Sequence, residues 1–179
     1  PTGGPPFGYV AQIDAPAAGD WTVQIGDGPD VASCQTFRVH DRGAYRQAAG
    51  GYPWQPRRSW NRHTENLYSL WVEELFNHPL DDRTWKNLSE LIAQPERNVL
   101  YNHLGQGEDS TLHLKPDCAD LPYFLRAYFS WKLRLPFAYR HCNRGRKGKA
   151  PYCDRDLHDN FTEIEASTAV SSFSEFARN

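Results

Sequence analysis

The chain has 179 residues and a formal charge of −2, from 20 Lys and Arg against 22 Asp and Glu. This near balance argues against a general nucleic-acid binder, so no nucleic-acid partner is expected. No apolar run reaches the ~20 residues of a membrane-spanning helix, and the sequence predicts no membrane span. Hydrophobic residues make up 39% of the chain, which is enough for a domain with a core of its own.

Residues 1–56 are predicted to form an N-terminal β-like segment and a linker. Apolar and polar residues alternate over 21–25 and again over 36–40, with a turn rich in Gly and Asp between the two runs. Such alternation on either side of a turn indicates a β-hairpin. Residues 41–56 are rich in Gly, Ala, Arg and Pro, a composition that is typical of a linker.

Residues 57–179 are predicted to be a helical, cysteine-bearing part, because the spacing of apolar residues changes there from 2 to 3.6. Thr64 is the expected cap of the first helix, and Asp81 and Asp82 are the expected caps of the second. The fold class is therefore α+β, with a helical middle and a small N-terminal β element. The expected helices cover 67–75, 85–92, 95–105, 121–135 and 170–177, and short strands are expected over 111–114 and 137–140.

Cys118 is the candidate nucleophile of the sequence. It lies between Asp117 and Asp120, immediately before the most apolar helix. A helix N-terminus lowers the pKa of a thiol, and its free N–H groups stabilise the oxyanion that forms when a thiolate attacks a carbonyl. The two carboxylates repel a thiolate unless they cap the helix, and Asp120 is the expected cap and orienting residue. The competing interpretation is a buried or disulfide-bonded Cys118 with no catalytic role.

The segment from Asp117 to Phe137, with Cys118-Ala119-Asp120 opening a long apolar helix, resembles the nucleophile segment of papain-fold thiol enzymes. It is most similar to bacterial transglutaminase-like cysteine proteinases and less so to NlpC/P60 peptidoglycan hydrolases. The resemblance implies a papain-like or transglutaminase-like domain, incomplete at its C-terminus in this chain. It also implies a cysteine-dependent hydrolase or acyl transferase acting on an amide bond of a peptide or of peptidoglycan, with no cofactor and no metal.

A thiol enzyme of this kind needs a histidine that takes the proton of the nucleophile. The families named above place it on a strand downstream of the cysteine. His158 lies downstream but in a polar run, whereas His113 lies in a strand-like run but precedes Cys118. We therefore expect the natural chain to continue past Asn179 into strands, one of which carries the histidine. If the base lies within this chain, it is His113 or His158.

Cys142 and Cys153 bracket a run rich in basic residues that has little apolar content to order it. We predict that these two cysteines form a disulfide and that Cys34 and Cys118 are free, which implies a periplasmic or extracellular protein. A zinc site built from His141, Cys142, Cys153 and His158 is the competing interpretation, but its spacing is unfamiliar for zinc. The alternative function is a non-catalytic exported domain that binds a protein or glycan partner through basic loops and exposed aromatic side chains, of which Trp54 and Trp60 are the candidates.

Overall fold

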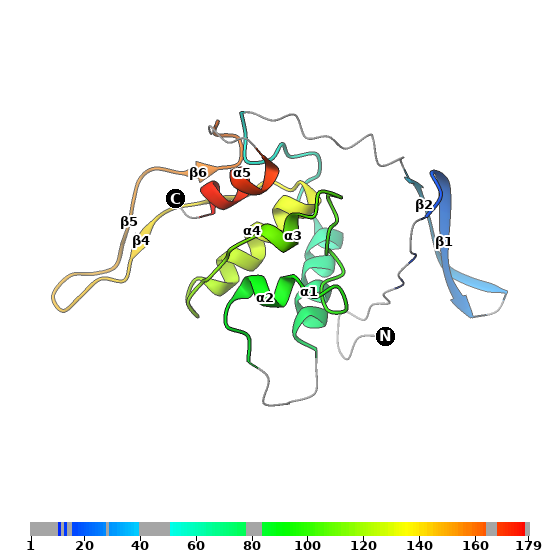
Figure 1. Cartoon of the computed structure of the whole chain (residues 1–179), viewed down its shortest axis with the longest axis horizontal. Coiled ribbons are helices and arrows are strands. Elements are labelled where there is room, and N and C mark those ends of the chain that lie inside the picture. Colours follow the sequence, from blue (N-terminus) through cyan, green and yellow to red (C-terminus); the bar gives the residue numbers. More distant parts are fainter. Residues whose placement is uncertain are drawn as a thin grey trace. The chain divides into compact units, whose positions relative to one another are not determined.

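The computed structural model describes residues 11, 13, 16–27, 29–39, 51–77, 84–163 and 168–177. The chain divides into two compact units, Tyr9–Gln47 and a larger unit that contains Ala48–Asn179 (Figure 1). Each unit is described by itself.

The smaller unit is a β-hairpin, as the alternating sequence pattern predicts. Strand β1 (Gly19–Asp27) pairs antiparallel with β2 (Asp30–Val39). Polar side chains of the two strands contact each other on one face of the hairpin. The hydroxyls of Thr22 and Thr36 lie 3.2 Å apart, and Arg38 donates two hydrogen bonds of 2.7 Å to Asp20. Cys34 is exposed on the same face of β2, opposite Gln24.

The larger unit begins with two helices whose caps differ from the predicted ones. Helix α1 (Arg62–Phe76) is capped by the side chain of Asn61, and Thr64 is the reciprocal partner in a capping box. Helix α2 (Leu88–Ile92) is capped by Asn87 and does not include Trp85. Asp81 and Asp82, the predicted caps of the second helix, lie outside the described residues.

The segment between α2 and the next long helix departs further from the sequence pattern. Residues 95–104 form successive turns instead of a helix, because the side chain of Asn98 accepts a hydrogen bond from the N–H of Leu100 and donates one to the carbonyl of Ile92. Helix α3 (Glu108–Thr111) follows, and residues 112–117 are extended without pairing as a strand. The strand predicted over 111–114 is therefore wrong.

Helix α4 (Leu121–Leu133) is the centre of the core, and α5 (Ala169–Phe176) packs against it. The ring of Trp131 stacks on Phe173 of α5 at 4.4 Å between centroids, and Tyr128 stacks on Trp71 of α1 at 5.5 Å. These rings are nearly inaccessible to solvent. The apolar stripes of the sequence are thus used for packing, as is usual for such patterns.

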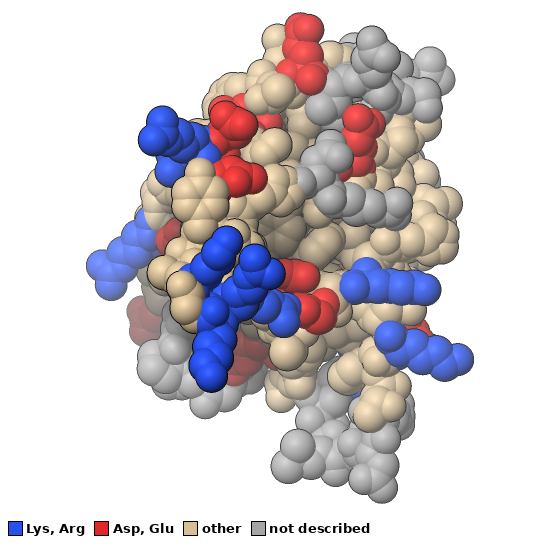
Figure 2. Space-filling model, turned by 90° about the vertical axis from the view of Figure 1, so that its left-hand side faces the viewer, with Lys and Arg blue, Asp and Glu red and all other residues tan. Residues whose placement is uncertain are grey.

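After α4 the chain forms an antiparallel arm over residues 138–159. Strand β3 (Ala138–Tyr139) pairs with β6 (His158–Asp159), and β4 (Cys142–Asn143) pairs with β5 (Tyr152–Cys153). The arm projects from the helices in Figure 1. Figure 2 looks at the molecule from that side and shows several Lys and Arg side chains close together, with acidic side chains beside them.

Helices and small antiparallel sheets together make this a mixed α+β protein. Among the helices in the described part of the chain, none has the length and apolar composition that crossing a membrane requires.

Candidate functional site around Cys118

Asp117, and not Asp120, caps the helical turn that carries Cys118. One carboxylate oxygen of Asp117 accepts hydrogen bonds from the N–H groups of Ala119 (2.8 Å) and Asp120 (3.0 Å). Its carbonyl accepts the N–H of Leu121 at 3.0 Å, which is the spacing of an α-helical bond. The side chain of Asp120 makes no capping hydrogen bond. Asp120 is the N-cap residue of α4 by position, as expected, but the side chain that caps the turn is that of Asp117.

This cap makes Cys118 the first residue of the helical turn that leads into α4. Its thiol is free and exposed. Pro122 is tolerated here because it lies in the first helical turn. The one hydrogen bond lost through its missing N–H is the bond to the carbonyl of Cys118. The Asp117 carboxylate occupies the N–H groups of Ala119 and Asp120. In the described part of the chain, no hydrogen bond uses the N–H of Cys118 itself.

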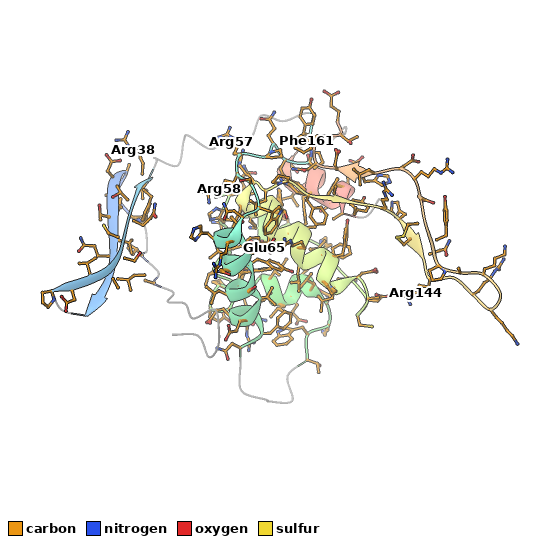
Figure 3. The ribbon with its side chains drawn as sticks, turned by 180° about the vertical axis from the view of Figure 1, so that it is seen from behind. Arg38, Arg57, Arg58, Glu65, Arg144 and Phe161 are labelled. Carbon is orange, nitrogen blue, oxygen red and sulfur yellow. A yellow bond between two sulfur atoms is a disulfide. The ribbon has the colours of Figure 1, made fainter. Side chains whose placement is uncertain are left out.

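The arm brings a second charged residue to the start of this turn. The guanidinium of Arg144 forms an ion pair with the second carboxylate oxygen of Asp117. Figure 3 shows Arg144 on the arm, beside the segment that enters α4. Asp117 thus joins two segments that are distant in the sequence, and both of its oxygens have partners.

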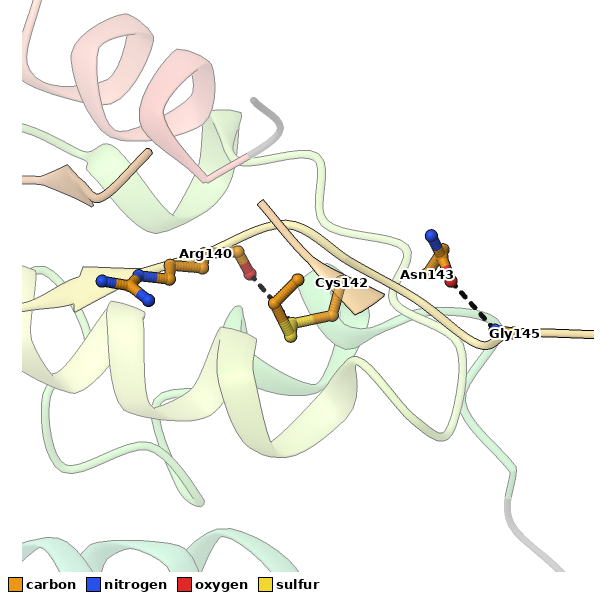
Figure 4. Close-up of a disulfide and its surroundings, with 5 residues drawn as sticks. Arg140, Cys142, Asn143 and Gly145 are labelled. Carbon is orange, nitrogen blue, oxygen red and sulfur yellow. Dashed lines mark hydrogen bonds between the residues drawn. A yellow bond between two sulfur atoms is a disulfide. The ribbon is translucent and has the colours of Figure 1, made fainter. Parts of the chain in front are cut away.

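A disulfide fixes the stem of the arm, as the sequence predicts. Cys142 and Cys153 lie opposite each other in the ladder and are bonded (Figure 4). Cys34 and Cys118 are free, which confirms the predicted pairing. Because Cys142 and Cys153 are bonded to each other, they do not serve as zinc ligands. Among the described residues, no group of three or more His, Cys, Asp or Glu side chains is arranged to hold a metal ion.

Electrostatics around the turn follow from these contacts. The backbone N–H of Asp120, then Arg144, then the N–H of Ala119 hold the pKa of Asp117 below its usual value. The carboxylate of Asp117 raises the pKa of Arg144 in turn, and Asp120 and Cys118 lie close enough to contribute. Asp117 is thereby an ionised cap whose charge is balanced by Arg144, so its repulsion of a thiolate at Cys118 is reduced.

The two candidate bases lie in different surroundings. His113 is exposed on the extended segment before Cys118 and not on a strand. His158 lies on β6, where its ring stacks on Tyr139 at 5.1 Å and meets the edge of His141 at 4.8 Å. Within the described residues, no hydrogen bond joins Cys118 to His158. The structure therefore does not assemble a nucleophile and base pair from Cys118 and His158.

Two tyrosines connect the first turn of α4 with the arm. The rings of Tyr123 and Tyr139 meet edge to face at 5.1 Å, and the hydroxyl of Tyr139 donates to the carbonyl of Phe176 at 2.7 Å. Burial raises the pKa of Tyr123 first, and the neighbouring Tyr139 and the charge of Asp120 raise it further. Both hydroxyls stay protonated over the physiological range, so they act as hydrogen-bond donors and not as bases.

A second charged cluster, which the sequence analysis missed, lies in the core. The ammonium of Lys132 contacts carboxylate oxygens of Glu108 and Asp109, and all three side chains are fully buried. Tyr128 donates a 2.7 Å hydrogen bond to Asp109, and Asn98 donates one of 2.9 Å to Tyr128. The sequence signal for this cluster is the position of Lys132 on the apolar stripe of its helix. Lys132 follows Phe129, Tyr128 and Leu125 at helical spacing.

The tryptophans considered as an exposed binding surface belong mainly to the core. Trp54 is 1% exposed, and its N–H donates to the carbonyl of Leu135 at 2.8 Å. Trp60 is partly buried, and the guanidinium of Arg126 lies 3.4 Å from its ring centroid. The expected exposure of Trp54 is therefore wrong, because its ring fills the space against Phe137, Phe173 and Phe176.

Comparison of the chain with protein-family models, with curated proteins and with solved structures gives no match.

Proposed function

We propose that this protein is a cysteine-dependent hydrolase or acyl transferase acting on an amide bond of a peptide or of peptidoglycan, with Cys118 as its nucleophile. The observation that carries the proposal is the exposed thiol at the first residue of a helical turn, behind an ionised cap. The resemblance of residues 117–137 to papain-fold thiol enzymes supports a papain-like or transglutaminase-like relationship, most similar to transglutaminase-like cysteine proteinases and next to NlpC/P60 hydrolases.

In the proposed reaction, the thiolate of Cys118 attacks the carbonyl carbon of the amide and forms a tetrahedral intermediate. The N–H of Cys118 is the oxyanion donor that the turn offers, since the Asp117 carboxylate already occupies the next two N–H groups. The base takes the thiol proton and delivers it to the leaving amine, and water or an acceptor amine then releases the acyl group. Within this chain, His113 and His158 are the two candidates for the base.

Cys34 provides an internal reference for testing the nucleophile, because it is also free and exposed. We expect iodoacetamide to label Cys118 several times faster than Cys34 in the same native molecule at neutral pH, since only Cys118 lies at a helix start. Peptide mapping of a time course gives both rates. Labelling of Cys118 at the rate of Cys34 or below would remove the basis of the proposal.

Activity provides the second test. Release of amines from a fluorescent casein and from purified peptidoglycan covers the two proposed substrate classes. Cys118→Ser is expected to abolish any such release, whereas Cys34→Ser leaves it unchanged. The circular dichroism of both variants should match that of the parent protein. If Cys118→Ser retains the activity of the parent protein, Cys118 is not the nucleophile.

We also propose a periplasmic or extracellular location, which the Cys142–Cys153 disulfide supports because such bonds persist in oxidising compartments.

The alternative is a non-catalytic exported domain that binds a partner, and the exposed basic residues of the arm favour it. The labelling experiment separates the two functions, because a binding domain does not require an activated Cys118.

A further inference from the structure

The arm carries a concentration of positive charge that the proposed reaction does not use. Arg144 is ion-paired with Asp117. Within the described residues, no ion pair involves any of the other four cations. The cations between positions 140 and 149, all of them exposed and with no acidic residue among them, are Arg140, Arg144, Arg146, Lys147 and Lys149.

The structure holds the end of the arm in a defined shape. Arg146 and Lys149 exchange two backbone hydrogen bonds, of 3.0 and 2.7 Å, across a tight turn. Gly148 in that turn has a φ of 80°, and Gly145 has a φ of 71° with no room for a side chain against the carbonyl of Lys149. The disulfide closes the other end of this loop. The cations are therefore presented together without a large ordering cost on binding.

An exposed aromatic residue follows these cations in the sequence. Tyr152 is 56% exposed. Side chains alternate across a strand, so Tyr152 lies on the face of the arm opposite to the one that carries the disulfide. A tyrosine ring has an apolar body and a polar end, which suits the boundary between lipid headgroups and acyl chains.

We propose that the loop closed by the disulfide, through residues 146–152, binds an anionic lipid surface. The arm projects from the helices in Figure 1, so Arg146, Lys147 and Lys149 in its turn reach a flat surface before the rest of this unit does, and Tyr152 lies behind them, next to the disulfide. A partner that is a single extended chain is usually bound in a groove, whereas this hairpin projects from the protein. A flat surface is therefore the partner that suits it better. Basic residues next to a membrane add attraction to anionic headgroups, and an apolar side chain adds depth of insertion.

The test is sedimentation of the full chain with lipid vesicles. We expect binding to phosphatidylcholine vesicles that contain about 30% phosphatidylglycerol and none to pure phosphatidylcholine, with loss of binding near 0.5 M salt because screening is then strong. Arg146→Glu/Lys147→Glu/Lys149→Glu should weaken binding on the order of 100-fold. Arg57→Glu/Arg58→Glu/Arg62→Glu makes the same charge change on exposed residues elsewhere, and we expect a much smaller loss.

Equal losses in the two triple variants would overturn the proposal, since net charge and not the arm would then control binding. Binding to soluble polyglutamate but not to anionic vesicles would also overturn it and would assign the arm to an acidic polymer. Thermal melts show whether each variant is folded. Cys118→Ser should bind vesicles like the parent protein, so this result and the test of the nucleophile are independent.

Discussion

Two acidic pairs lie on either side of the extended segment 112–116, and they have opposite environments. Glu108 and Asp109 are fully buried with Lys132, whereas Asp117 and Asp120 are exposed, Asp117 with Arg144 as its partner. In both places a cation from a distant segment reaches back to a carboxylate. Burial therefore decides what a contact between a carboxylate and a cation does. The buried Glu108 and Asp109 stabilise the fold, whereas the exposed Asp117 positions side chains at the surface.

The buried pair also organises the chain before α3. Glu108 accepts the N–H groups of Leu104 (2.9 Å) and Gln106 (3.1 Å), and Asp109 accepts that of Asn102 (2.6 Å). A buried charge is tolerated only when it is paired and hydrogen-bonded, and these carboxylates satisfy both conditions. The exposed ion pair contributes little to stability because water competes for both partners, so its effect is on the geometry beside Cys118.

The largest effect is expected from Lys132→Met, which removes the cation and leaves two carboxylates in the core. Breaking a buried ion pair in this way costs about 3–5 kcal/mol of the free energy of unfolding. Urea denaturation followed by tryptophan fluorescence measures the loss. Lys115→Met is the matched control, because Lys115 is exposed, and its effect should stay within about 0.5 kcal/mol. Equal effects of the two substitutions would show that the core cluster is not a stabilising network.

An intermediate effect is expected from acid. Burial raises the pKa of Glu108, but the Lys132 ammonium and the N–H of Leu104 outweigh burial and hold the pKa below its ordinary value of 4.5. The unfolded carboxyl therefore binds its proton at a higher pH than the folded one. The stability from this group is present above about pH 4.5 and is lost as the pH falls through the folded pKa. Glu108→Gln should flatten the dependence of the urea midpoint on pH below 4.5, and an unchanged dependence would contradict this assignment.

Much of the fold follows from local patterns in the sequence. The alternating residues over 21–25 predict the hairpin, the apolar stripe over 121–135 predicts α4, and the basic run between Cys142 and Cys153 predicts their disulfide. Each of these features depends on neighbouring residues or on a short loop. The caps were predicted less well, because Asn61, Asn87 and Asp117 compete with several nearby polar residues that have the same capping chemistry.

The remaining features depend on contacts between distant segments, which no local pattern contains. The ion pair of Arg144 with Asp117 and the burial of Trp54 against α5 are of this kind. Lys132 lies near the end of an apolar helix, and its position on the stripe of Tyr128 and Phe129 indicates burial, but this spacing does not identify its partners. Glu108 and Asp109 follow Gly105 and Gly107, and no apolar pattern marks this part of the sequence as buried. Their pairing becomes visible only when α3 and α4 are placed side by side.

The smallest expected effect distinguishes the two exposed acids. Asp117→Ala and Asp120→Ala each remove one carboxylate near Cys118, so a purely electrostatic effect would speed the alkylation of Cys118 in both. Only Asp117 holds two N–H groups of the turn and Arg144. We therefore expect Asp117→Ala to slow the labelling of Cys118 about two- to fivefold, because the helix start frays and Arg144 is released. Asp120→Ala should leave the rate unchanged or raise it slightly. Cys34 in the same molecule is the reference for each rate, and equal acceleration in both variants would show that charge, and not the cap, controls the thiol.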